Sequence, residues 1–470
     1  MRIPILLAAL LIVSLPLRSE PNGVDLVPCE PASELLCGTL TVPEDHGVPG
    51  GRTIELSIVI APAIEPREGA APLFILDGGP GLAATSAAEF FLDPLGREHR
   101  AGRDVVLVDQ RGTGGSGALR CPALERRSPL ESMFPVGLVR ECREELSRRA
   151  DLTRYGTIDA ARDLDRVREA LGHDAIDLWS VSYGTQLARQ FMRLYPDRVR
   201  SAVLIGTPPA DLRTPLHHSL NAHRAVELAF HACQSDAACA AAYPDVRAEW
   251  SSLLARLGRE PVRVEHEGKS FELSRGIFAE ALRSFLSTGA AFRRFPAIVH
   301  AAAAGDFHPF LKVIPAGSSA YSEGLYLSNV CPEGTMRIAP TEIAPATAGT
   351  WFGDYRLREQ RAACEAWENG VAPDALFAEP DSNAQVLFIH GELDQVAAPN
   401  PAREACAAMP HCRFVLVPSM GHVPFDFDQW TNGLCLETIT LAFYRNPDLG
   451  ALDLRCLETL KPPPFQIPTP

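Results

Sequence analysis

One short segment constrains the fold of this chain more than any other: residues 178–185, which read Leu-Trp-Ser-Val-Ser-Tyr-Gly-Thr. Residues 174–179, which overlap its start, are mostly apolar and predict a short buried strand. Residues 186–195 have the apolar spacing of an amphipathic helix, which Pro196 ends. Ser182 therefore lies on a sharp turn between a buried strand and a helix.

The residues around this serine match the usual signature of such a turn, Gly-x-Ser-x-Gly, in all but one position. Small residues are needed on both sides because larger ones would clash in the turn. Ser180 stands where the first glycine is expected, and Gly184 supplies the second. Ser and Gly are common, so the pattern is weak alone and gains weight from the flanking strand and helix. We expect the Ser182 hydroxyl to be exposed at the edge of a sheet.

A serine hydroxyl is a poor nucleophile near neutral pH and needs a base, which in turn needs an orienting carboxylate. Asp394 follows a predicted strand at residues 384–390, and His422 follows another at residues 413–418. The chain order Ser, Asp, His is that of the α/β-hydrolases. We therefore predict a catalytic triad in which Ser182 attacks, His422 takes the proton and Asp394 holds the imidazole.

The charge that develops on an attacked carbonyl needs fixed N–H donors, an oxyanion hole. One donor should be the backbone N–H of Tyr183, the residue after the nucleophile. The loop after the apolar run at residues 72–76 reads Asp-Gly-Gly-Pro-Gly and fits the second donor. We choose Gly79, with Gly81 as the alternative, because Pro80 has no N–H to give. A plain turn would explain the same glycines.

Five motifs occur in order along the chain, at residues 77–81 (Asp-Gly-Gly-Pro-Gly), 109–116 (Asp-Gln-Arg-Gly-Thr-Gly-Gly-Ser), 180–184 (Ser-Val-Ser-Tyr-Gly), 391–394 (Gly-Glu-Leu-Asp) and 420–422 (Met-Gly-His). With these motifs the chain resembles the prolyl-aminopeptidase-like α/β-hydrolases, particularly their secreted tripeptidyl-aminopeptidase-like branch. The resemblance extends from about Cys37 to about Cys435. Asp77 stands where family members usually have His or another residue, and Ser180 stands where they usually have Gly. Neither removes a catalytic group, so the departures bear on substrate preference.

The resemblance implies an exopeptidase that releases one or a few residues from a peptide N-terminus. The branch tends to carry a cysteine pair in its cap, similar to Cys233 and Cys239, and a Cys-x-acid element, similar to Cys331 and Glu333. A bound N-terminal ammonium loses water and needs a carboxylate nearby. Glu333 is our candidate for that carboxylate, and an ordinary exposed glutamate is the alternative.

Predicted strands alternate with helices along much of the chain, at residues 53–61, 73–76, 105–109, 176–179, 202–205, 386–389 and 414–417. This alternation predicts a mostly parallel sheet with helices on both faces, the α/β-hydrolase fold, with an inserted, mainly helical cap. We expect a signal peptide at 1–20, core at 21–210, the cap at 211–381, core again at 382–460 and a Pro-rich tail at 461–470.

The N-terminus has the character of an export signal. The apolar run at residues 3–13 follows Arg2 and is too short to span a membrane comfortably. An uncleaved membrane anchor is the alternative. Twelve cysteines support export to a periplasmic or extracellular compartment. Their natural local pairs are Cys29–Cys37, Cys121–Cys142, Cys233–Cys239, Cys331–Cys364, Cys406–Cys412 and Cys435–Cys456.

A rival interpretation concerns residues 112–117, which match the dinucleotide-binding pattern Gly-x-Gly-x-x-Gly after a strand. Pro122 argues against the helix that such a site needs. We expect a structural loop beneath the active site, with Asp109 and Arg111 in internal polar contacts.

Composition disfavours several other classes. The net charge is −14 without a basic run, so nucleic acid and anionic membranes are not expected partners. No metal-binding motif is present, and no cofactor is expected. His217, His218 and His223 cluster in the predicted cap, where such histidines are usually exposed.

Together these observations predict an exported serine hydrolase acting on peptides. An esterase or amidase for small molecules is the alternative, because a triad does not distinguish the two. A catalytically silent binding protein on the same fold is the more distant alternative. The sequence leaves the oligomeric state open.

Overall fold

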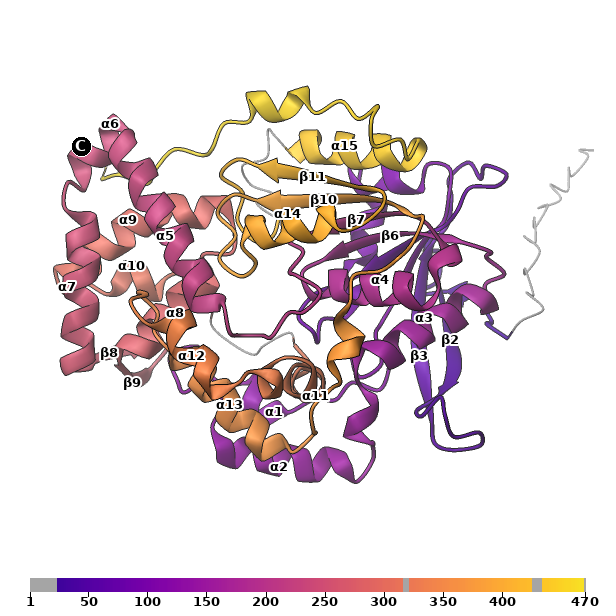
Figure 1. Ribbon diagram of the computed structural model, residues 1–470, viewed down its shortest axis with the longest axis horizontal. Helices are drawn as coiled ribbons and strands as arrows, with labels where there is room; N and C mark the ends of the chain where they lie inside the picture. Colours follow the sequence, from indigo (N-terminus) through magenta and orange to yellow (C-terminus); the bar gives the residue numbers. More distant parts are fainter. Residues whose placement is uncertain (1–22, 316–320, 425–432, 469–470) are drawn as a thin grey trace, which may run out of the picture.

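The computed structural model describes residues 23–315, 321–424 and 433–468. The predicted signal peptide at 1–20 lies outside these residues. Within them the main sheet has nine strands in the order β1-β2-β3-β5-β4-β6-β7-β10-β11 (Figure 1). The strands are β1 Val27–Pro28, β2 Leu36–Pro43, β3 Thr53–Ala61, β4 Leu73–Leu76, β5 Val105–Val108, β6 Ile176–Val181, β7 Val199–Ile205, β10 Gln385–Gly391 and β11 Cys412–Val417.

The sheet is antiparallel at one side and parallel over the rest. Strands β1, β2, β3 and β5 pair antiparallel in turn, whereas β5, β4, β6, β7, β10 and β11 pair parallel. The fold prediction is confirmed, and the first two strands are the elements that the sequence pattern did not reveal. Strand β2 is mostly half-exposed, so it lacks the apolar run that marks a buried strand.

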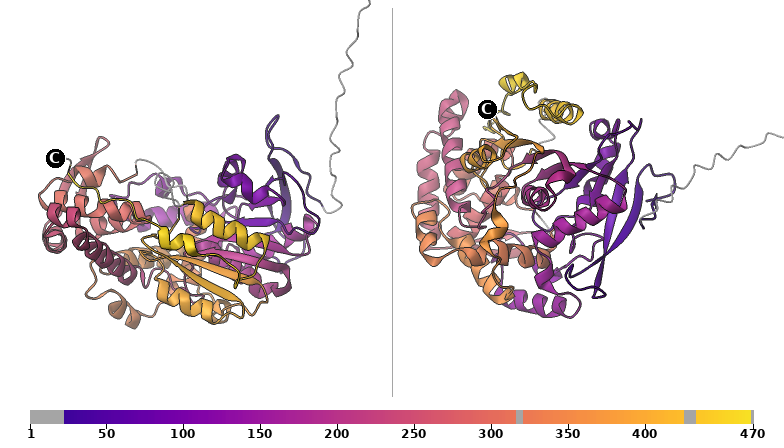
Figure 2. Two further views of the ribbon diagram at one scale, coloured as in Figure 1. Left: turned by 90° about the horizontal axis from the view of Figure 1, so that it is seen from above. Right: turned by 45° about the vertical axis from the view of Figure 1, so that its right-hand side comes forward.

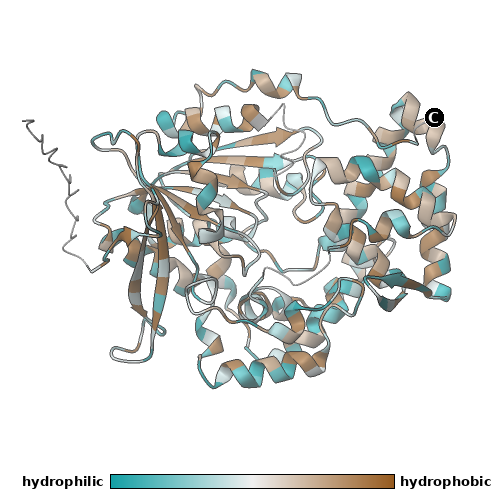
Figure 3. Ribbon diagram, turned by 180° about the vertical axis from the view of Figure 1, so that it is seen from behind, coloured by the Kyte–Doolittle hydropathy of each residue, from teal (hydrophilic) through white to brown (hydrophobic). Residues whose placement is uncertain are grey.

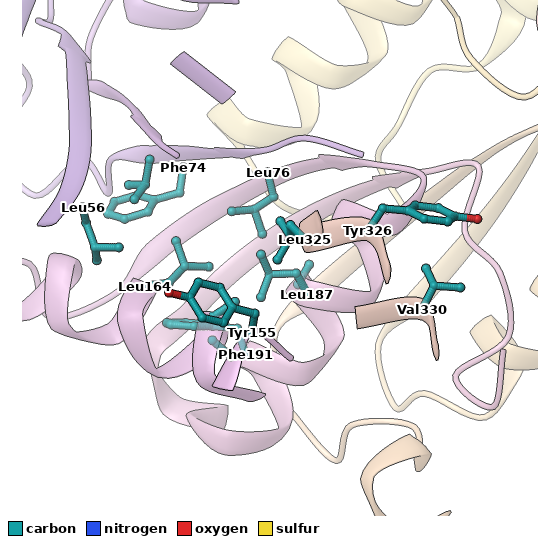
Figure 4. Packing of buried hydrophobic residues seen from close by; sticks show 14 of the residues in the cluster. Leu56, Phe74, Leu76, Tyr155, Leu164, Leu187, Phe191, Leu325, Tyr326 and Val330 are labelled. Atoms are coloured by element: carbon teal, nitrogen blue, oxygen red, sulfur yellow. The ribbon is translucent and has the colours of Figure 1, made fainter. Parts of the chain in front are cut away.

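Alternate side chains of the central strands enter different hydrophobic layers. Phe74 and Leu76 of β4 pack with residues of helices α3 (Thr157–Ala170) and α4 (Tyr183–Leu194), as Figure 4 shows. Leu73 and Ile75 instead pack with η1 (Ala84–Leu92) and α15 (Gly433–Arg445) on the other face. Both faces of the sheet are therefore buried, and Figure 3 shows these strands as mainly hydrophobic.

The chain forms mainly helices between β7 and β10, together with a hairpin of β8 (Val262–His266) and β9 (Lys269–Leu273). The helices are α5 His218–Ser235, α6 Ala237–Ala242, α7 Val246–Arg259, α8 Arg275–Phe285, α9 Gly289–Ala303, α10 His308–Leu311, α11 Glu323–Glu333, α12 Pro340–Thr347 and α13 Tyr355–Trp367. Many of them share a second hydrophobic core around Trp250, Phe278 and Phe295. We call residues 211–381 the cap, and Figures 1 and 2 show its helices beside the sheet.

Three further helices complete the layers around the sheet and the cap. Helix α14 (Pro399–Ala407) packs on β10 and β11, and α1 (Pro122–Glu125) is a single turn. Helix α2 (Val136–Ser147) lies against α13, and Arg143 Nε donates to the Trp367 carbonyl at 2.6 Å. A segment that precedes the nucleophile in the chain therefore supports the cap.

Six disulfides join the pairs that the sequence predicted: Cys29–Cys37, Cys121–Cys142, Cys233–Cys239, Cys331–Cys364, Cys406–Cys412 and Cys435–Cys456. The described part of the tail lacks regular structure and reaches the cap (Figure 1). There Phe465 is buried, and the Arg293 guanidinium lies 4.3 Å from its ring centroid. In the described residues, no helix has the length and apolar character that crossing a membrane requires.

Candidate active site

The predicted turn at Ser182 has the geometry of a nucleophile elbow. Ser182 lies between β6 and α4 with φ 54° and ψ −124°, a conformation that costs a non-glycine residue about 1–3 kcal/mol. A Cβ on Gly184 would lie 2.3 Å from the Leu76 carbonyl oxygen, so only glycine fits there. Ser180 is fully buried, and its hydroxyl donates to the Val203 carbonyl at 3.3 Å. The departure from glycine at this position is therefore accommodated.

The three residues of the predicted triad come together at the carboxyl edge of the parallel strands. His422 Nε2 lies 2.9 Å from Ser182 Oγ, and His422 Nδ1 lies 2.8 Å from Asp394 Oδ2. The other carboxylate oxygen of Asp394 accepts the N–H groups of Val396 and Ala397 at 2.8 and 2.7 Å. The serine thus has a base within reach, and the base has a fixed carboxylate behind it.

Asp394 is fully buried between two histidines, and sequence reasoning missed one of them. His390 Nε2 lies 3.3 Å from Asp394 Oδ2 and 2.7 Å from the Ala397 carbonyl oxygen. Burial would raise the pKa of Asp394, but His422 and His390 hold it well below the ordinary value. A permanent carboxylate therefore faces the imidazole. The sequence feature that could have revealed His390 is its place at the end of the strand before Asp394, only a few positions away.

Both predicted oxyanion-hole residues lie beside the nucleophile in one cavity. Tyr183 begins α4, so its N–H precedes the intrahelical hydrogen bonds and points from the positive end of the helix dipole. In the glycine loop, the Gly78 N–H donates to Asp77 Oδ1 at 2.6 Å. Gly79, with φ +115°, is the next N–H of that loop. Burial raises the pKa of Asp77, the residue that departs from the family pattern.

The Tyr183 side chain connects the nucleophile's helix to the cap. Its hydroxyl accepts from Gln110 Nε2 at 3.1 Å and from Asn329 Nδ2 of α11 at 3.0 Å. It also lies 3.0 Å from Thr157 Oγ1, whose own proton goes to Glu333 Oε2 at 2.5 Å. A chain of buried hydrogen bonds therefore runs from beside the oxyanion hole to Glu333. Gln110, Asn329 and Thr157 carried no signal that the sequence alone would single out.

Glu333 lines the same cavity as Ser182 and His422. Its Oε1 accepts the Thr157 N–H at 2.6 Å, in addition to the hydroxyl bond above. Burial raises the pKa of Glu333 to about 7, with the Thr157 hydrogen bonds opposing the rise and Asp159 adding to it. The charge of Arg337, which is paired with Asp211 and Asp374, also opposes the rise. The carboxylate is held in place at the cavity wall, with no cation paired to it among the described residues.

The cap contacts the loops that carry Asp394 and His422. Asn221 Nδ2 of α5 donates to the Val396 carbonyl at 2.6 Å, and Arg224 Nη2 donates to the Asp394 carbonyl at 3.1 Å. The Val423 N–H, next to His422, donates to the Ser287 carbonyl at 3.1 Å. The cap therefore helps to position the triad as well as to enclose it.

The expectation of exposed histidines in the cap is wrong for His218. Its side chain is buried, lines the cavity and leaves Nδ1 without a hydrogen-bond partner among the described residues. Burial lowers its pKa well below the ordinary value, and the charges of Arg356 and Arg283 lower it further. The first turn of α5 is folded against the active-site edge, which a local sequence pattern does not reveal.

The glycine loop at residues 112–117 has the structural role that we expected. The Asp109 carboxylate accepts from Thr85 and from the Gly115 N–H at 2.8 Å. Arg111 is buried and donates to both oxygens of Asp163 at 2.6 Å. Internal polar contacts for Asp109 and Arg111 are confirmed, and the contact with Asp109 occupies the Gly115 N–H, which a bound phosphate would need.

Residues 71–227 match the family model described as alpha/beta hydrolase fold. The chain has the α/β-hydrolase fold. The chain is 30% identical over 227 residues to the serine protease Hip1 of Mycobacterium tuberculosis, covering 44% of this chain and 42% of the relative. It is 31% identical over 225 residues to carboxylesterase B of the same organism, with coverages of 44% and 42%. It is 30% identical over 214 residues to the tripeptidyl aminopeptidase of Streptomyces coelicolor, with coverages of 40% and 38%.

The chain therefore spans about two fifths of the length of these curated relatives. The relatives include a protease, an aminopeptidase and an esterase. The matches do not distinguish among these three activities.

Proposed function

We propose that this protein is an exported serine hydrolase that removes one or a few residues from the N-termini of peptides. The observation that carries the proposal is the contact chain from Ser182 Oγ through the His422 imidazole to Asp394, at 2.9 and 2.8 Å. A serine, an imidazole and a buried carboxylate in this order are the requirements of acyl transfer.

The proposed reaction proceeds through an acyl-enzyme. Ser182 Oγ attacks the substrate carbonyl while His422 takes the hydroxyl proton, and Asp394 stabilises the imidazolium. The N–H groups of Tyr183 and Gly79 stabilise the negative oxygen of the tetrahedral intermediate. His422 then gives its proton to the leaving amine. A water molecule, activated by the same imidazole, hydrolyses the ester on Ser182 and restores the free enzyme.

Glu333 supports an exopeptidase over an endopeptidase. Its half-buried carboxylate lines the cavity of Ser182 and is held by Thr157, with no cation paired to it among the described residues. A substrate ammonium would supply that partner and recover the free energy lost on burial. The similarity to the tripeptidyl aminopeptidase of Streptomyces coelicolor agrees with this substrate class.

An esterase or amidase for small molecules is the second candidate, because carboxylesterase B is equally similar in sequence. Triad geometry serves both reactions, so substrates must decide between them. A catalytically silent binding protein is the third candidate and would not need the hydrogen-bonded triad.

Export is supported by the covalent structure. Six disulfides are typical of proteins that fold in an oxidising compartment. We place the protein in a periplasmic or extracellular compartment, in solution or held by an N-terminal anchor.

Two measurements test the proposed function. A fluorophosphonate probe should label Ser182, and the absence of labelling would favour a binding protein. A panel of peptides with free N-termini, their N-acetylated forms and aryl esters then separates the enzymes. We expect cleavage of the free peptides and loss of cleavage on acetylation. Equal hydrolysis of free and blocked peptides would move the assignment to the esterase or amidase.

A further inference from the structure

The cap contains a buried ion cluster whose positive charges outnumber its negative ones. Glu280 of α8 accepts from Arg283 through three contacts of 2.7, 2.9 and 3.1 Å. The same carboxylate accepts Arg356 Nη1 of α13 at 2.6 Å. Burial opposes ionisation of Glu280, but the two guanidiniums hold its pKa below the ordinary value. One carboxylate thus faces two permanent cations, which leaves one positive charge uncompensated within the cluster.

Arg356 presents this charge to the cavity of the nucleophile. It is one of the residues that line the cavity, and its side chain is 16% exposed. Its Nη2 donates to the Tyr326 hydroxyl at 3.3 Å, while its Nε is buried without a partner among the described residues. Tyr326 lines the same wall, and Figure 4 shows its ring extending away from Leu325 with the hydroxyl outermost.

Neighbouring groups do not neutralise Arg356 from the cavity side. Glu333 is the one carboxylate among the described residues that line the cavity, and it is held by Thr157 at the α3 wall. The other lining arginine, Arg189, is already paired with Glu379 at 2.9 and 3.1 Å. His218 lines the cavity together with Arg356 and His422, and its Nδ1 has no hydrogen-bond partner among the described residues.

Arg356 and His218 line the same cavity as the imidazole of His422. His422 returns its proton to the leaving amine, so the leaving fragment lies against the imidazole. That fragment therefore shares the cavity with the cation and with the unpartnered nitrogen of His218. An anion there would bind to a guanidinium in a site of low water content, where such hydrogen bonds are strong.

We propose that Arg356, assisted by His218, forms a subsite for a carboxylate on the leaving fragment of the substrate. This inference rests on the proposed peptidase function and specifies its substrate. Either of two parts of a substrate can supply this carboxylate: the C-terminus of a short peptide, or an acidic side chain next to the scissile bond. The cavity then has a carboxylate for the substrate's ammonium and a cation for its anion, and it selects short zwitterionic or acidic peptides.

The test uses substrates that share one N-terminal part and differ in the leaving fragment. One pair places Asp or Asn directly after the scissile bond, with the C-terminus amidated. A second pair places Ala there, with a free or an amidated C-terminus. An arylamide of the same N-terminal part provides a neutral reference. We expect the anionic member of one pair to have a kcat/KM about 10- to 100-fold higher than its neutral partner. The pair that shows the preference identifies the source of the carboxylate.

In the Arg356→Gln variant, the ratio of kcat/KM for the anionic substrate to that for its neutral partner should fall to about 1. The matched control is Arg103→Gln, because Arg103 also shares one buried carboxylate, Asp177, with a second arginine but lies outside the cavity. The control should retain the preference. If Arg356→Gln fails to fold, a second measurement compares inhibition of the unmodified enzyme by Ala-Ala and by the C-terminal amide of Ala-Ala. We expect the free acid to bind more tightly than the amide.

Three outcomes are decisive. Cleavage of the arylamide with no preference in either pair and equal inhibition by the two dipeptides would overturn the subsite and leave the proposed function standing. A preference that Arg356→Gln retains would assign anion recognition to other residues. Failure of the enzyme to cleave the arylamide and every peptide would overturn the proposed function, and the subsite with it.

Discussion

Asp394, which is fully buried, and Glu333, which is half-buried, are carboxylates beside the same cavity, yet their surroundings drive their pKa values in opposite directions. Asp394 lies at the edge of the sheet, where two histidines and two backbone N–H groups favour its charged form. Glu333 lies where α11 meets α3 and has Thr157 as its hydrogen-bond donor, with Asp159 nearby. The pKa of the first is held well below the ordinary value, whereas burial raises that of the second to about 7.

The difference separates two kinds of task. A carboxylate that orients an imidazole must stay charged throughout the reaction, so its partners are built into the protein. A carboxylate that binds a substrate cation is most useful when its partner arrives with the substrate. Asp394 therefore has its charged partners within the protein, whereas Glu333 gains its charged partner when the substrate binds. The predictions below test this division.

The largest effect is expected from Ser182→Ala. Removing the nucleophile should lower kcat by about 10⁴- to 10⁶-fold on peptides and esters alike, because both substrates need the acyl-enzyme. Thermal unfolding should be little changed. Ser180→Ala is the matched control, since its hydroxyl contacts only the Val203 carbonyl among the described residues. Inactivation by the control and not by Ser182→Ala would place the elbow elsewhere.

Asp394→Asn should follow, with a loss in kcat of about 10⁴-fold, because the amide favours the wrong tautomer of His422 and cannot stabilise the imidazolium. The loss should be somewhat smaller than that of His422→Ala. Steady-state kinetics on a peptide and an aryl ester should give equal factors. A loss confined to peptides would mean that Asp394 serves binding, and the distinction between the two carboxylates would fail.

Glu333→Gln should have a smaller and selective effect. Loss of a charge-assisted bond worth about 1.5–3 kcal/mol predicts a kcat/KM about 10- to 100-fold lower for peptides with free N-termini. Aryl esters, which have no ammonium, should be hydrolysed at nearly the original rate. Equal losses on both substrates would show that Glu333 acts by supporting Tyr183 through Thr157.

The pH dependence should show the raised pKa of Glu333. Its carboxyl is protonated below about pH 7 and charged above it, so only the higher pH provides a partner for an ammonium. The ratio of kcat/KM for a free peptide to that for an ester should rise by about tenfold through pH 7. The ratio cancels any pH dependence of the catalytic steps, which both substrates share. It should fall again above about pH 8, where the α-amino group loses its proton. A flat ratio would remove Glu333 from amine binding.

The smallest change in rate is expected from opening the Cys331–Cys364 bridge, which joins α11 to α13 next to Glu333. Replacing both cysteines by serine should lower the free energy of unfolding by about 2–5 kcal/mol. Hydrolysis of peptides should fall a few-fold more than hydrolysis of esters. The bridge between Cys29 and Cys37 is the control, because it lies in the N-terminal strands, and its removal should not alter the ratio.

Much of the sheet edge could be predicted from the sequence because its determinants are local. An apolar strand, a polar loop and the next helix are consecutive in the chain, so Ser182, Asp394 and His422 could each be placed at the end of a parallel strand. The disulfide pairs were also predictable, since the two cysteines of each pair are only 6 to 33 positions apart in the chain.

The chemistry of the cap wall was decided only by tertiary structure. The contacts of Glu333 with Thr157, the pairing of Arg356 with Glu280 and the burial of His218 each depend on segments that are far apart in the chain. The pKa of a carboxylate depends on the water it loses and on the charges that packing brings near it, and neither is encoded in adjacent residues. The sequence by itself therefore determined the fold and the proposed catalytic residues, whereas packing between cap and core decided which charges meet the substrate.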